Sequence, residues 1–489
     1  MKAKLSQLMT DWFSADLAED AQRIEIRSIV IDSRQVTSDA LFVAIQGIAS
    51  DGRRYIEAAI HAGASAVLAE TEDEHEHGSL RWSQHVPVIY CYDLKDRLAQ
   101  LARRYYVDLP RYIVGVTGTN GKSTTTHLIA SLAQLSGIQS AVMGTLGNGR
   151  LGQLSGAINT TADIFTIYRQ LHEFATQGIE LVAMEVSSHG LAQGRVDGIP
   201  FSAAVFTNLT RDHLDYHGTM EAYGAAKARL FEMTRNRVQV INRDDPFGQQ
   251  LLRQYAGAIS YSLESDADWT AHLLALMPTG SEIEIHGPAS TQTLQIPLLG
   301  RFNISNTLAA VSCLDGLALL TPSMLQLCQQ LHNVPGRMEL FTGNTQVVVD
   351  YAHTPDALAK ALQGVREHCK GQLICIFGCG GDRDRGKRPL MAAAAEQNAD
   401  WVIVTNDNPR TESPEAIVAD ILPGFNDLKA VRIQLDRQQA LKDALSLAGE
   451  TDMILLAGKG HEDYQIIGHE KRPYDERRIV QQLLEAQLC

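Results

Sequence analysis

The sequence predicts an α/β protein with three domains. Short apolar runs alternate with helix-like segments along most of the chain, a pattern typical of mostly parallel sheets covered by helices. The chain has 489 residues, which is too long for one hydrophobic core. One apolar run leads into a Gly-rich loop of the phosphate-binding type. We expect the domains to be residues 1–90, 91–332 and 333–489.

The composition is that of an ordinary soluble globular protein. Apolar residues make up 45% of the chain and charged residues 20%, and no apolar run reaches the ~18 residues that a membrane span requires. A net charge of −14 argues against a general nucleic-acid binder. The N-terminus lacks the apolar segment of a secretory signal, and seven scattered cysteines suit reduced thiols. We expect a cytoplasmic location, no nucleic-acid partner and no insertion into a membrane.

The first domain contains short strand-like runs and few chemically distinctive residues. A polar turn at 32–39 follows the first run, and residues 51–55 open a helix-like segment. The tract 72–77 is rich in Glu and His and resembles a metal cluster, but no apolar frame surrounds it, so we interpret it as a solvated loop. The expected strands are 29–31, 41–45, 66–69 and 86–90.

The most informative stretch lies near the start of the second domain. An apolar run at 113–116 is followed by Gly118-Thr-Asn-Gly121, then by Lys122, Ser123 and a helix-like segment. The glycines allow several backbone N–H groups to point at one anion. Lys122 can reach the β- and γ-phosphates, and the Ser123 hydroxyl can bind magnesium. The common P-loop motif has a further glycine at the position of Val116, whereas here the glycine lies one residue earlier, at 115. The stretch nevertheless predicts a nucleoside triphosphate site.

Two later strands of the second domain end in polar loops. The run 179–184 leads into 185–190, and the run 203–206 leads into 207–218. Because the carboxyl ends of parallel strands meet at one edge of a sheet, both loops are expected beside Lys122. Glu185, Asp212 and His213 are therefore candidate magnesium ligands, although each alone also suits a structural role. The remaining expected elements are strands at 140–143 and 238–241, short irregular strands at 257–297, and a helix beginning near 299–306.

A second alternation of strands and helices begins near residue 333 and predicts a Rossmann-like domain. It lacks the Gly-x-Gly-x-x-Gly fingerprint near its first strand, so dinucleotide binding is not expected. Cys375 and Cys379 suit core thiols better than metal ligands. Four strands end in polar loops, which together predict a ligand site: 351–356, 378–385, 405–410 and 457–462. The expected strands are 347–350, 373–377, 401–404, 431–435 and 453–456, with helices at 356–368 and 414–422.

Along its whole length the sequence resembles the Mur ligases, and most closely the branch that adds meso-diaminopimelate to UDP-N-acetylmuramoyl-L-alanyl-D-glutamate. One departure is Ala162, where many relatives carry Pro or another residue. The motifs shared across the family are 117–123, 185–189, 207–213, Gly336-Arg337 and 350–353. The narrower motifs are Asn159-Thr-Thr161, Gln193-x-Arg195 and Asp407-Asn-Pro-Arg410, the last of which that branch uses to select diaminopimelate over lysine.

The resemblance implies an ATP-dependent, ADP-forming amide ligase of peptidoglycan precursor synthesis, and hence of cell wall biogenesis, cell shape and cell division. ATP phosphorylates the D-glutamyl carboxylate, the amine of the diamino acid attacks the acyl phosphate, and a tetrahedral intermediate collapses to the amide and phosphate. It also implies an N-terminal uridine-nucleotide domain, a central P-loop ATPase domain, a C-terminal amino-acid-binding domain and a monomer.

The resemblance further implies an ATP site and two magnesium ions. One ion is held by Ser123 and Glu185, and the other by Glu185, His213 and Lys227. Lys227 lies on an amphipathic helix at 222–231, where position alone suggests a solvated lysine; the family carries a carbamate there, whose negative charge suits magnesium. The implied catalytic residues are Lys122, Glu185, His213 and Lys227. The implied ATP-binding residues are Gly118, Thr119, Asn120, Gly121, Lys122, Ser123, Thr124, Asn306, Arg337, Asp350 and His353.

Two substrate sites also follow from the resemblance. An arginine fork suits the distal carboxylate of diaminopimelate, which lysine lacks, and Glu462 suits the distal ammonium. Arg410 is the firmer candidate, because Arg383 lies in a charged turn at 382–385 that could simply be solvated. The implied diaminopimelate residues are Arg383, Asp407, Asn408, Pro409, Arg410, Gly458 and Glu462. The implied UDP-substrate residues are Ile31, Ser33, Ile48, Ala49, Ser50, Asn159, Thr160, Thr161, Ser187, Gln193 and Arg195.

Two alternatives remain open. Folylpolyglutamate synthase and the ligases that add alanine, glutamate or the terminal dipeptide share the fold, but the quartet 407–410 and the triplet 159–161 argue against them. A P-loop switch without ligase activity leaves the polar loops of the third domain unexplained.

Overall fold

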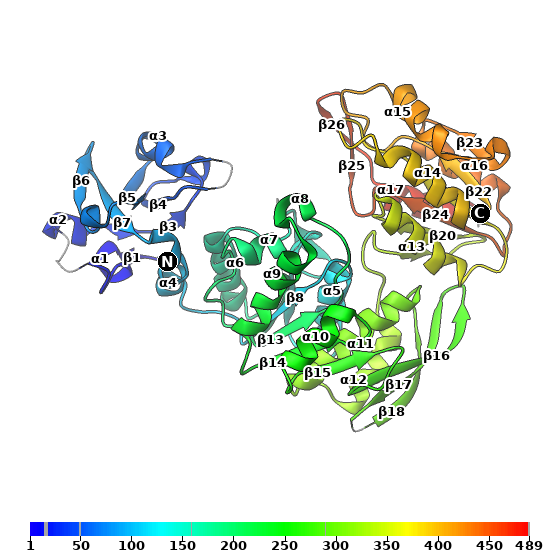
Figure 1. The fold of residues 1–489 in the computed structure, drawn as a ribbon, viewed down its shortest axis with the longest axis horizontal. Coiled ribbons are helices and arrows are strands. Elements are labelled where there is room, and N and C mark those ends of the chain that lie inside the picture. The colour runs from blue at the N-terminus through cyan, green and yellow to red at the C-terminus, as the bar shows by residue number, and fades with distance from the viewer. Residues whose placement is uncertain (14–17, 48–49, 158, 289, 488–489) are drawn as a thin grey trace. The chain divides into compact units, whose positions relative to one another are not determined.

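The computed structural model describes residues 1–13, 18–47, 50–157, 159–288 and 290–487 (Figure 1). It divides into two compact units. The first comprises Met1–Thr117, Ile138–Ser202 and His213–Arg237, and the second comprises Gly118–Gly137, Ala203–Asp212 and Val238–Cys489. The predicted Ile48 and Ala49 lie outside the described residues.

The N-terminal part of the first unit contains a five-stranded sheet. Its strand order is β3-β4-β5-β7-β6, with β6 antiparallel to β7 and the other neighbours parallel. All five residues of β4 are buried, as expected of a parallel strand between two neighbours. The four predicted strands are confirmed within one or two residues, and the tract 72–77 contains a short turn, Glu74–Glu76, in which no residue is buried. The strands are β3 (Ser28–Val30), β4 (Ala40–Ala44), β5 (Ala64–Thr71), β6 (Leu80–Ser83) and β7 (Val86–Tyr92), with helices α3 (Ile56–His61) and α4 (Leu94–Tyr105).

The same unit contains five further strands in the order β11-β10-β9-β12-β8. Strands β9, β12 and β8 are parallel and match predicted runs. The hairpin of β10 and β11 was not predicted, because its glycines and polar residues carry no apolar pattern. The strands are β8 (Tyr112–Thr117), β9 (Ser140–Gly144), β10 (Gly147–Arg150), β11 (Gln153–Ser155) and β12 (Leu181–Glu185). The helices are α6 (Ile164–Thr176), α7 (Ser188–Ala192), α8 (Leu214–His217) and α9 (Met220–Met233).

The second unit begins with the glycine loop and the helix α5 (Lys122–Leu135), and continues with strands β13 to β18. The strands predicted at 257–297 are confirmed, but β16, β17 and β18 are longer than the short strands expected and form an antiparallel ribbon, with one register irregularity between Leu273 and Ala275. Polar residues on the outer face hid the alternation that buries Ile283 and Ile285. The elements are β13 (Ala203–Phe206), β14 (Val238–Asn242), β15 (Ile259–Ser262), β16 (Trp269–Met277), β17 (Gly280–Gly287), β18 (Ser290–Ile296) and α11 (Arg301–Gly316).

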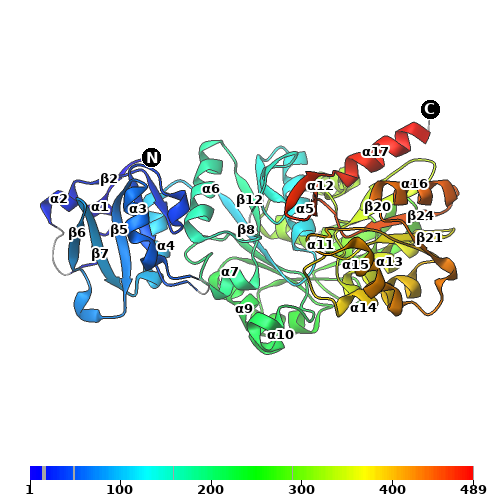
Figure 2. The same ribbon diagram turned by 90° about the horizontal axis from the view of Figure 1, so that it is seen from above.

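A six-stranded sheet in the order β19-β20-β24-β21-β22-β23 ends this unit. Only β19 is antiparallel, so the carboxyl ends of the other five strands share one edge. Figure 2 shows α13, α14 and α15 on one face and α16 and α17 on the other. The strands are β19 (Glu339–Phe341), β20 (Gln346–Asp350), β21 (Leu373–Phe377), β22 (Trp401–Val404), β23 (Val431–Ile433) and β24 (Met453–Ala457). The helices are α13 (Pro355–Arg366), α14 (Lys387–Asn398), α15 (Pro414–Ile421), α16 (Arg437–Leu447) and α17 (Glu476–Gln487).

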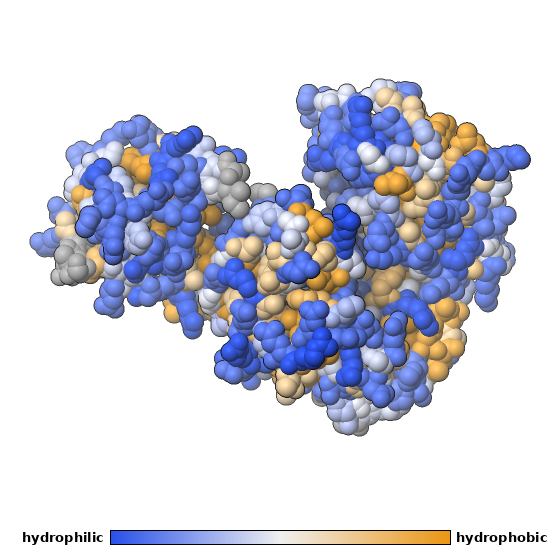
Figure 3. Space-filling view, in the orientation of Figure 1, coloured by the Kyte–Doolittle hydropathy of each residue, from blue (hydrophilic) through white to orange (hydrophobic). Residues whose placement is uncertain are grey.

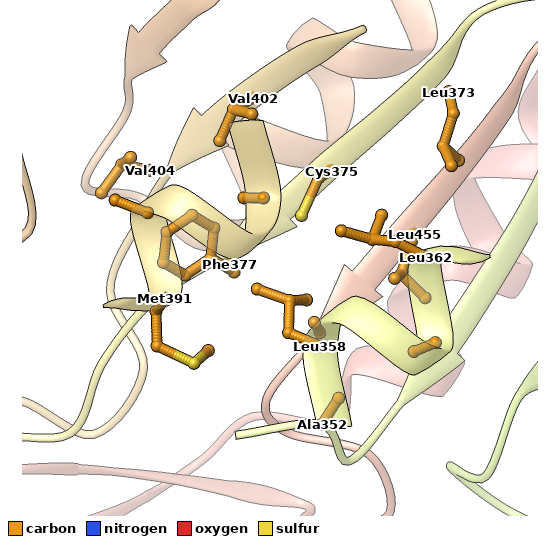
Figure 4. Packing of buried hydrophobic residues seen from close by; sticks show 14 of the residues in the cluster. Ala352, Leu358, Leu362, Leu373, Cys375, Phe377, Met391, Val402, Val404 and Leu455 are labelled. Atoms are coloured by element: carbon orange, nitrogen blue, oxygen red, sulfur yellow. The ribbon is translucent and has the colours of Figure 1, made fainter. Parts of the chain in front are cut away.

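One face of this sheet packs into a continuous apolar core. Figure 4 shows side chains of α13, β21, β22 and β24 pointing toward one another, with Cys375 beside Leu455. Phe377 and Leu358 are fully buried there, and burial of one such side chain contributes roughly 1.5–3 kcal/mol. Cys375 and Cys379 are buried core thiols, as predicted. This rigid base supports the loops at the carboxyl edge.

The visible surface in Figure 3 is mostly hydrophilic, with apolar residues in small groups. Within the described ranges, no helix combines the length and the apolar content that crossing a membrane would require.

Candidate active site

The glycine loop of the second unit has the backbone geometry that the sequence predicted. Gly118 and Gly121 adopt φ values of +152° and +85°, and a Cβ on Gly118 would lie 1.9 Å from Thr207 Oγ1. Only glycine fits such a position. Lys122 begins α5 and donates to the carbonyls of Gly118 and Thr119 at 2.9 Å each. Its ammonium therefore lies over the loop, where an anion would meet it together with the helix N-terminus.

Neighbouring polar residues brace this loop. Asn120 N–H donates to Asn208 Oδ1 at 2.9 Å, and the Thr207 hydroxyl donates to Asn120 O at 2.6 Å. A Cβ on Gly121 would lie 2.6 Å from Asn306 Oδ1, which also accepts from Thr125 at 3.3 Å. The structure thus brings Asn306 of α11 to the loop despite its distance in sequence. Ser123 and Thr124 are 8% exposed in the first turn of α5, and Asp212 is exposed.

The remaining predicted ATP residues gather at the start of the C-terminal sheet. Asp350 ends β20 and accepts backbone N–H bonds from Met338 and Ala352 at 2.8 Å each. Burial raises the pKa of Asp350, while Arg337 and these bonds oppose the rise. The Arg337 guanidinium lies 4.8 Å over the Tyr351 ring, and its buried Nε has no hydrogen-bond partner. His353 is exposed, with its ring 4.7 Å from that of Tyr351.

The first unit contains the buried carboxylate of Glu185, which is 2% exposed at the end of β12. One oxygen accepts from Thr145 N at 2.8 Å and the other from Thr145 Oγ1 at 3.2 Å. Thr160 Oγ1 lies 3.0 Å from that hydroxyl. A buried carboxylate is stabilised by a cation or by strong donors, so Glu185 fits the role of a magnesium ligand.

His213 and Lys227 also belong to the first unit. His213 adopts φ +52° just before α8, and its ring lies 4.9 Å from that of His189. Lys227 is 1% exposed on α9, with its Nζ 4.4 Å from the centre of the Tyr223 ring. The interpretation of Lys227 as a solvated lysine is therefore wrong, because α9 packs this side chain inward. No group of three or more His, Cys, Asp or Glu side chains forms a metal cluster within the described part of the chain. Magnesium commonly completes its shell with water and substrate phosphate.

A chain of hydrogen bonds links the residues predicted for the muramoyl peptide. Thr161 Oγ1 donates to Glu185 O at 3.1 Å and accepts from Ser187 N at 2.9 Å. Arg195 donates to Thr161 O at 2.8 Å and to Gln193 Oε1 at 2.9 Å. Ser187 also caps α7, so the loop after β12 is fixed by its own side chains.

A pocket of about 820 Å³ in the first unit contains some of these residues. Its walls include Ile31, Asn159, Gln193 and Arg195, together with Arg34 and Gln46, which were not predicted. Ser33, Ser50, Thr160, Thr161 and Ser187 are not among its lining residues. Ser33 begins a short turn, and Ser50 is exposed and donates to the Tyr55 hydroxyl at 3.3 Å. A volume of this size suits a small-molecule ligand.

The residues predicted for diaminopimelate meet at the carboxyl edge of the C-terminal sheet. Asn408 Nδ2 donates to Glu462 Oε2 at 3.0 Å, which joins the loops after β22 and β24. Gly458 adopts φ +116°, and a Cβ there would lie 2.5 Å from Asp407 Oδ2. Lys459, which the sequence did not single out, bonds to both Asn408 and Glu462 and is completely buried.

Arg410 adopts φ +51° and donates to Gly381 O at 2.8 Å. Pro409 comes so close that a Cβ on Gly381 would lie 1.9 Å from its carbonyl oxygen. The structure therefore joins the loops after β21 and β22. Arg383 is exposed and donates to Asp382 O at 3.3 Å within its own turn.

Two buried arginines hold these loops and were also missed. Arg388 is 0% exposed and binds Glu412 Oε1 at 2.9 Å and Gly380 O at 3.1 Å. Arg437 pairs with Glu476 and donates to the carbonyl of Ala457 at 2.8 Å. The Arg388 guanidinium and the N–H of Asp382 lower the pKa of Glu412 to about 2. No local sequence pattern marks such pairs, because their members lie far apart in the chain.

Family models match three parts of the chain. The model described as Mur ligase family, catalytic domain, matches residues 25–106, the Mur ligase middle domain matches 116–314, and the Mur ligase glutamate ligase domain matches 336–460. A Haemophilus influenzae UDP-N-acetylmuramoyl-L-alanyl-D-glutamate–2,6-diaminopimelate ligase is 47% identical over 481 residues, covering 96% of this chain and 98% of the relative. The chain belongs to the Mur ligase family. A Vibrio vulnificus ligase of the same name is 47% identical to this Mur ligase, with 98% of each chain covered.

Solved structures agree with this assignment. A UDP-N-acetylmuramoyl-L-alanyl-D-glutamate–2,6-diaminopimelate ligase matches this Mur ligase with a TM-score of 0.74 at 37% identity, over 100% of both chains. A MurF ligase from Thermotoga maritima matches with a TM-score of 0.64 at 20% identity, covering 89% of this chain and 94% of that one. The second likeness shows the fold alone. The predicted α/β fold and the predicted family are thus confirmed.

Proposed function

We propose that this Mur ligase joins an amino group of meso-diaminopimelate to the D-glutamyl carboxylate of UDP-N-acetylmuramoyl-L-alanyl-D-glutamate, converting ATP to ADP and phosphate. The observation that carries this proposal is the 47% identity, over nearly the whole chain, to diaminopimelate ligases. The product serves peptidoglycan synthesis, and through it cell wall biogenesis, cell shape and cell division.

The first chemical step requires positive charge, because ATP and a carboxylate are both anions. Lys122 and the N–H groups of the glycine loop neutralise the phosphates. Magnesium ions would supply further positive charge when bound, and their candidate ligands are Ser123 in the second unit and Glu185, His213 and a carbamate on Lys227 in the first. The burial of Lys227 supports a specific role for its side chain, since a lysine is rarely buried without a partner, and a carbamate there would offer magnesium a negative charge.

Recognition of diaminopimelate depends on the loops after β21, β22 and β24. Arg410 and Arg383 pair with the distal carboxylate, and Glu462 pairs with the distal ammonium. Lysine has no distal carboxylate and leaves the arginines unmatched, at a cost of about 1–3 kcal/mol. The UDP-muramoyl dipeptide binds in the pocket of the first unit, with its uridine nucleotide beside Ile31 and its muramoyl peptide beside Arg195.

We further propose three domains, at residues 1–90, 91–332 and 333–489, in a cytoplasmic monomer. The three separate family matches, at 25–106, 116–314 and 336–460, support a division into three parts.

Product mass analysis tests the activity. The enzyme is incubated with ATP, the dipeptide nucleotide and one of meso-diaminopimelate, L-lysine or L-ornithine. We expect a tripeptide product mainly with diaminopimelate, and ADP release that depends on the nucleotide substrate. A product formed equally well with lysine contradicts the proposed specificity, and ATP consumption without any peptide product contradicts a ligase.

Arg410→Lys tests the selector. We expect the ratio of kcat/KM for diaminopimelate over lysine to fall about tenfold or more, because lysine cannot reproduce the planar fork. Arg432→Lys, on the exposed side of β23, is the matched control and leaves the ratio unchanged. An unchanged ratio in Arg410→Lys rules out its role as a selector.

A further inference from the structure

Lys459 is a fully buried lysine at the edge where the candidate diaminopimelate residues meet. It follows β24 by two residues, and its side chain is 0% exposed. Its Nζ donates to Glu462 Oε2 at 2.8 Å and to Asn408 Oδ1 at 2.9 Å, and it lies 3.9 Å from Asp407 Oδ1. A lysine is rarely buried unless it is paired, and these three side chains are the partners that compensate the Lys459 ammonium.

We propose that Lys459 is a positioning residue for the amino-acid substrate, which fixes Glu462 and Asn408 in one arrangement and keeps Glu462 available as an anion for the substrate ammonium. This inference rests on the proposed function and deepens it. Lys459 acts through Glu462 and has no contact of its own with the reacting atoms.

The geometry divides the two carboxylate oxygens of Glu462 between protein and substrate. Oε2 accepts from both Lys459 and Asn408. Among the residues that the structure describes, Oε1 has one long contact, 3.5 Å from the Tyr464 hydroxyl. The two hydrogen bonds to Oε2 fix the orientation of the Glu462 carboxylate. Oε1 therefore points in one direction, which suits a hydrogen bond from an ammonium group.

The positive charge of Lys459 gives a second reason for its role, because it keeps the Glu462 carboxylate ionised. Glu462 is partly buried, and burial alone raises the pKa of its carboxyl, but the hydrogen bond and the charge of Lys459 bring the pKa below its usual value. Without Lys459, burial dominates, and Glu462 takes up a proton more readily. A protonated Glu462 can no longer pair with a substrate ammonium.

Other titratable groups surround Glu462 but do not replace Lys459. Burial and the charge of Glu462 raise the pKa of the Tyr351 and Tyr464 hydroxyls, so neither supplies a positive charge to Glu462. Asp407 carries the same charge as Glu462 and lies 3.9 Å from the Lys459 Nζ. His461 is adjacent in sequence, and burial lowers its pKa to about 4, so it is neutral near pH 7. Lys471 lies over the Tyr464 ring at 3.7 Å, on the exposed strand β26 (Glu470–Pro473).

The test uses Lys459→Met in the full chain, with KM measured separately for diaminopimelate, ATP and the dipeptide nucleotide between about pH 6.5 and 9. We expect the KM for diaminopimelate to rise about tenfold or more near pH 7 and to recover as the pH rises, because Glu462 then ionises. The KM values for ATP and the nucleotide stay within about twofold of the parent. Lys471→Met is the matched control and leaves all three KM values unchanged.

Three further variants make the test decisive. Lys459→Gln keeps a donor without the charge and shows the same pH-dependent KM, so it replaces Lys459→Met if that variant does not fold. Lys459→Arg keeps the charge and shows little pH dependence. Glu462→Gln raises the KM for diaminopimelate, with no recovery at high pH, since it carries no titrating group.

Two results overturn the inference. One is a diaminopimelate KM in Lys459→Met that matches the parent at every pH. The other is an equal rise in the KM for all three substrates, which indicates general structural damage. Failure of the proposed function is distinguishable, because the parent enzyme itself then forms no product with diaminopimelate.

Discussion

The buried pair of Arg437 and Glu476 gives the sharpest prediction about stability. Both side chains are at most 1% exposed, and Arg437 also donates to the carbonyls of Ala457 at 2.8 Å and Asn406 at 3.4 Å. Arg437→Met removes the guanidinium and leaves a buried carboxylate without its partner. Breaking such a pair costs about 3–5 kcal/mol of the free energy of unfolding. The lost bonds to two carbonyls act in the same direction.

Urea unfolding followed by peptide-resolved hydrogen exchange measures this loss. Peptides that cover β24 and α17 report on the C-terminal sheet, independently of the other parts of the chain. Arg432→Met removes an exposed arginine from the same sheet and should change the free energy by at most about 0.5 kcal/mol. The double variant Arg437→Met/Glu476→Leu should regain most of the loss, because neither charge is then buried alone.

Two outcomes would refute this reasoning. If Arg437→Met destabilises the sheet by less than about 1 kcal/mol, the burial of the Glu476 carboxylate does not depend on its pairing with Arg437. If the double variant is as unstable as the single one, the loss comes from packing of the arginine stem rather than from an unpaired carboxylate.

The remaining predictions concern catalysis, pH and a helix cap. Lys227→Ala should abolish ligation and Lys227→Glu should retain a trace, in a product assay where parent-like turnover of Lys227→Ala contradicts the carbamate. His368 accepts a hydrogen bond from Gly300 N and contacts Met277 O. Burial lowers the pKa of His368, so the neutral ring is the form that the folded protein favours. Its contribution to the free energy of unfolding is therefore present above about pH 6.5 and is lost as the pH falls. Urea midpoints should show this loss for the parent and not for His368→Gln. Asp163→Ala removes the N-cap of α6 and should cost about 1 kcal/mol in the same assay.

The sequence predicts those elements whose apolar residues follow each other without interruption. The run 373–377 is a strand of five buried residues, and the run 203–206 is a strand of four. Their carboxyl ends could be assigned to an edge because parallel strands require it. The ribbon of β16, β17 and β18 was predicted only as short irregular strands, since Thr, Gln, His and Glu alternate with its apolar residues and weaken the pattern.

The candidate site likewise contains some features that the sequence predicts and others that it does not. The conformations of Gly118 and Gly121 follow from their place between a strand and a helix, so they were predictable. The burial of Lys227 and Lys459 was not, because whether a lysine is solvated depends on which elements pack around it. Glu476 lies 39 residues after Arg437, and nothing in either neighbourhood indicates that the two meet.

The order of strands in the C-terminal sheet has a consequence for synthesis of the chain. β24 is the last of the six strands to be made, yet it lies between β20 and β21. Until residue 457 has left the ribosome, these two neighbours each lack a partner along one side. Their unpaired apolar edges can then associate with other chains. A message that ends before β24 should therefore yield aggregates or a target for proteases, and chaperones that cover nascent chains should matter most during this interval.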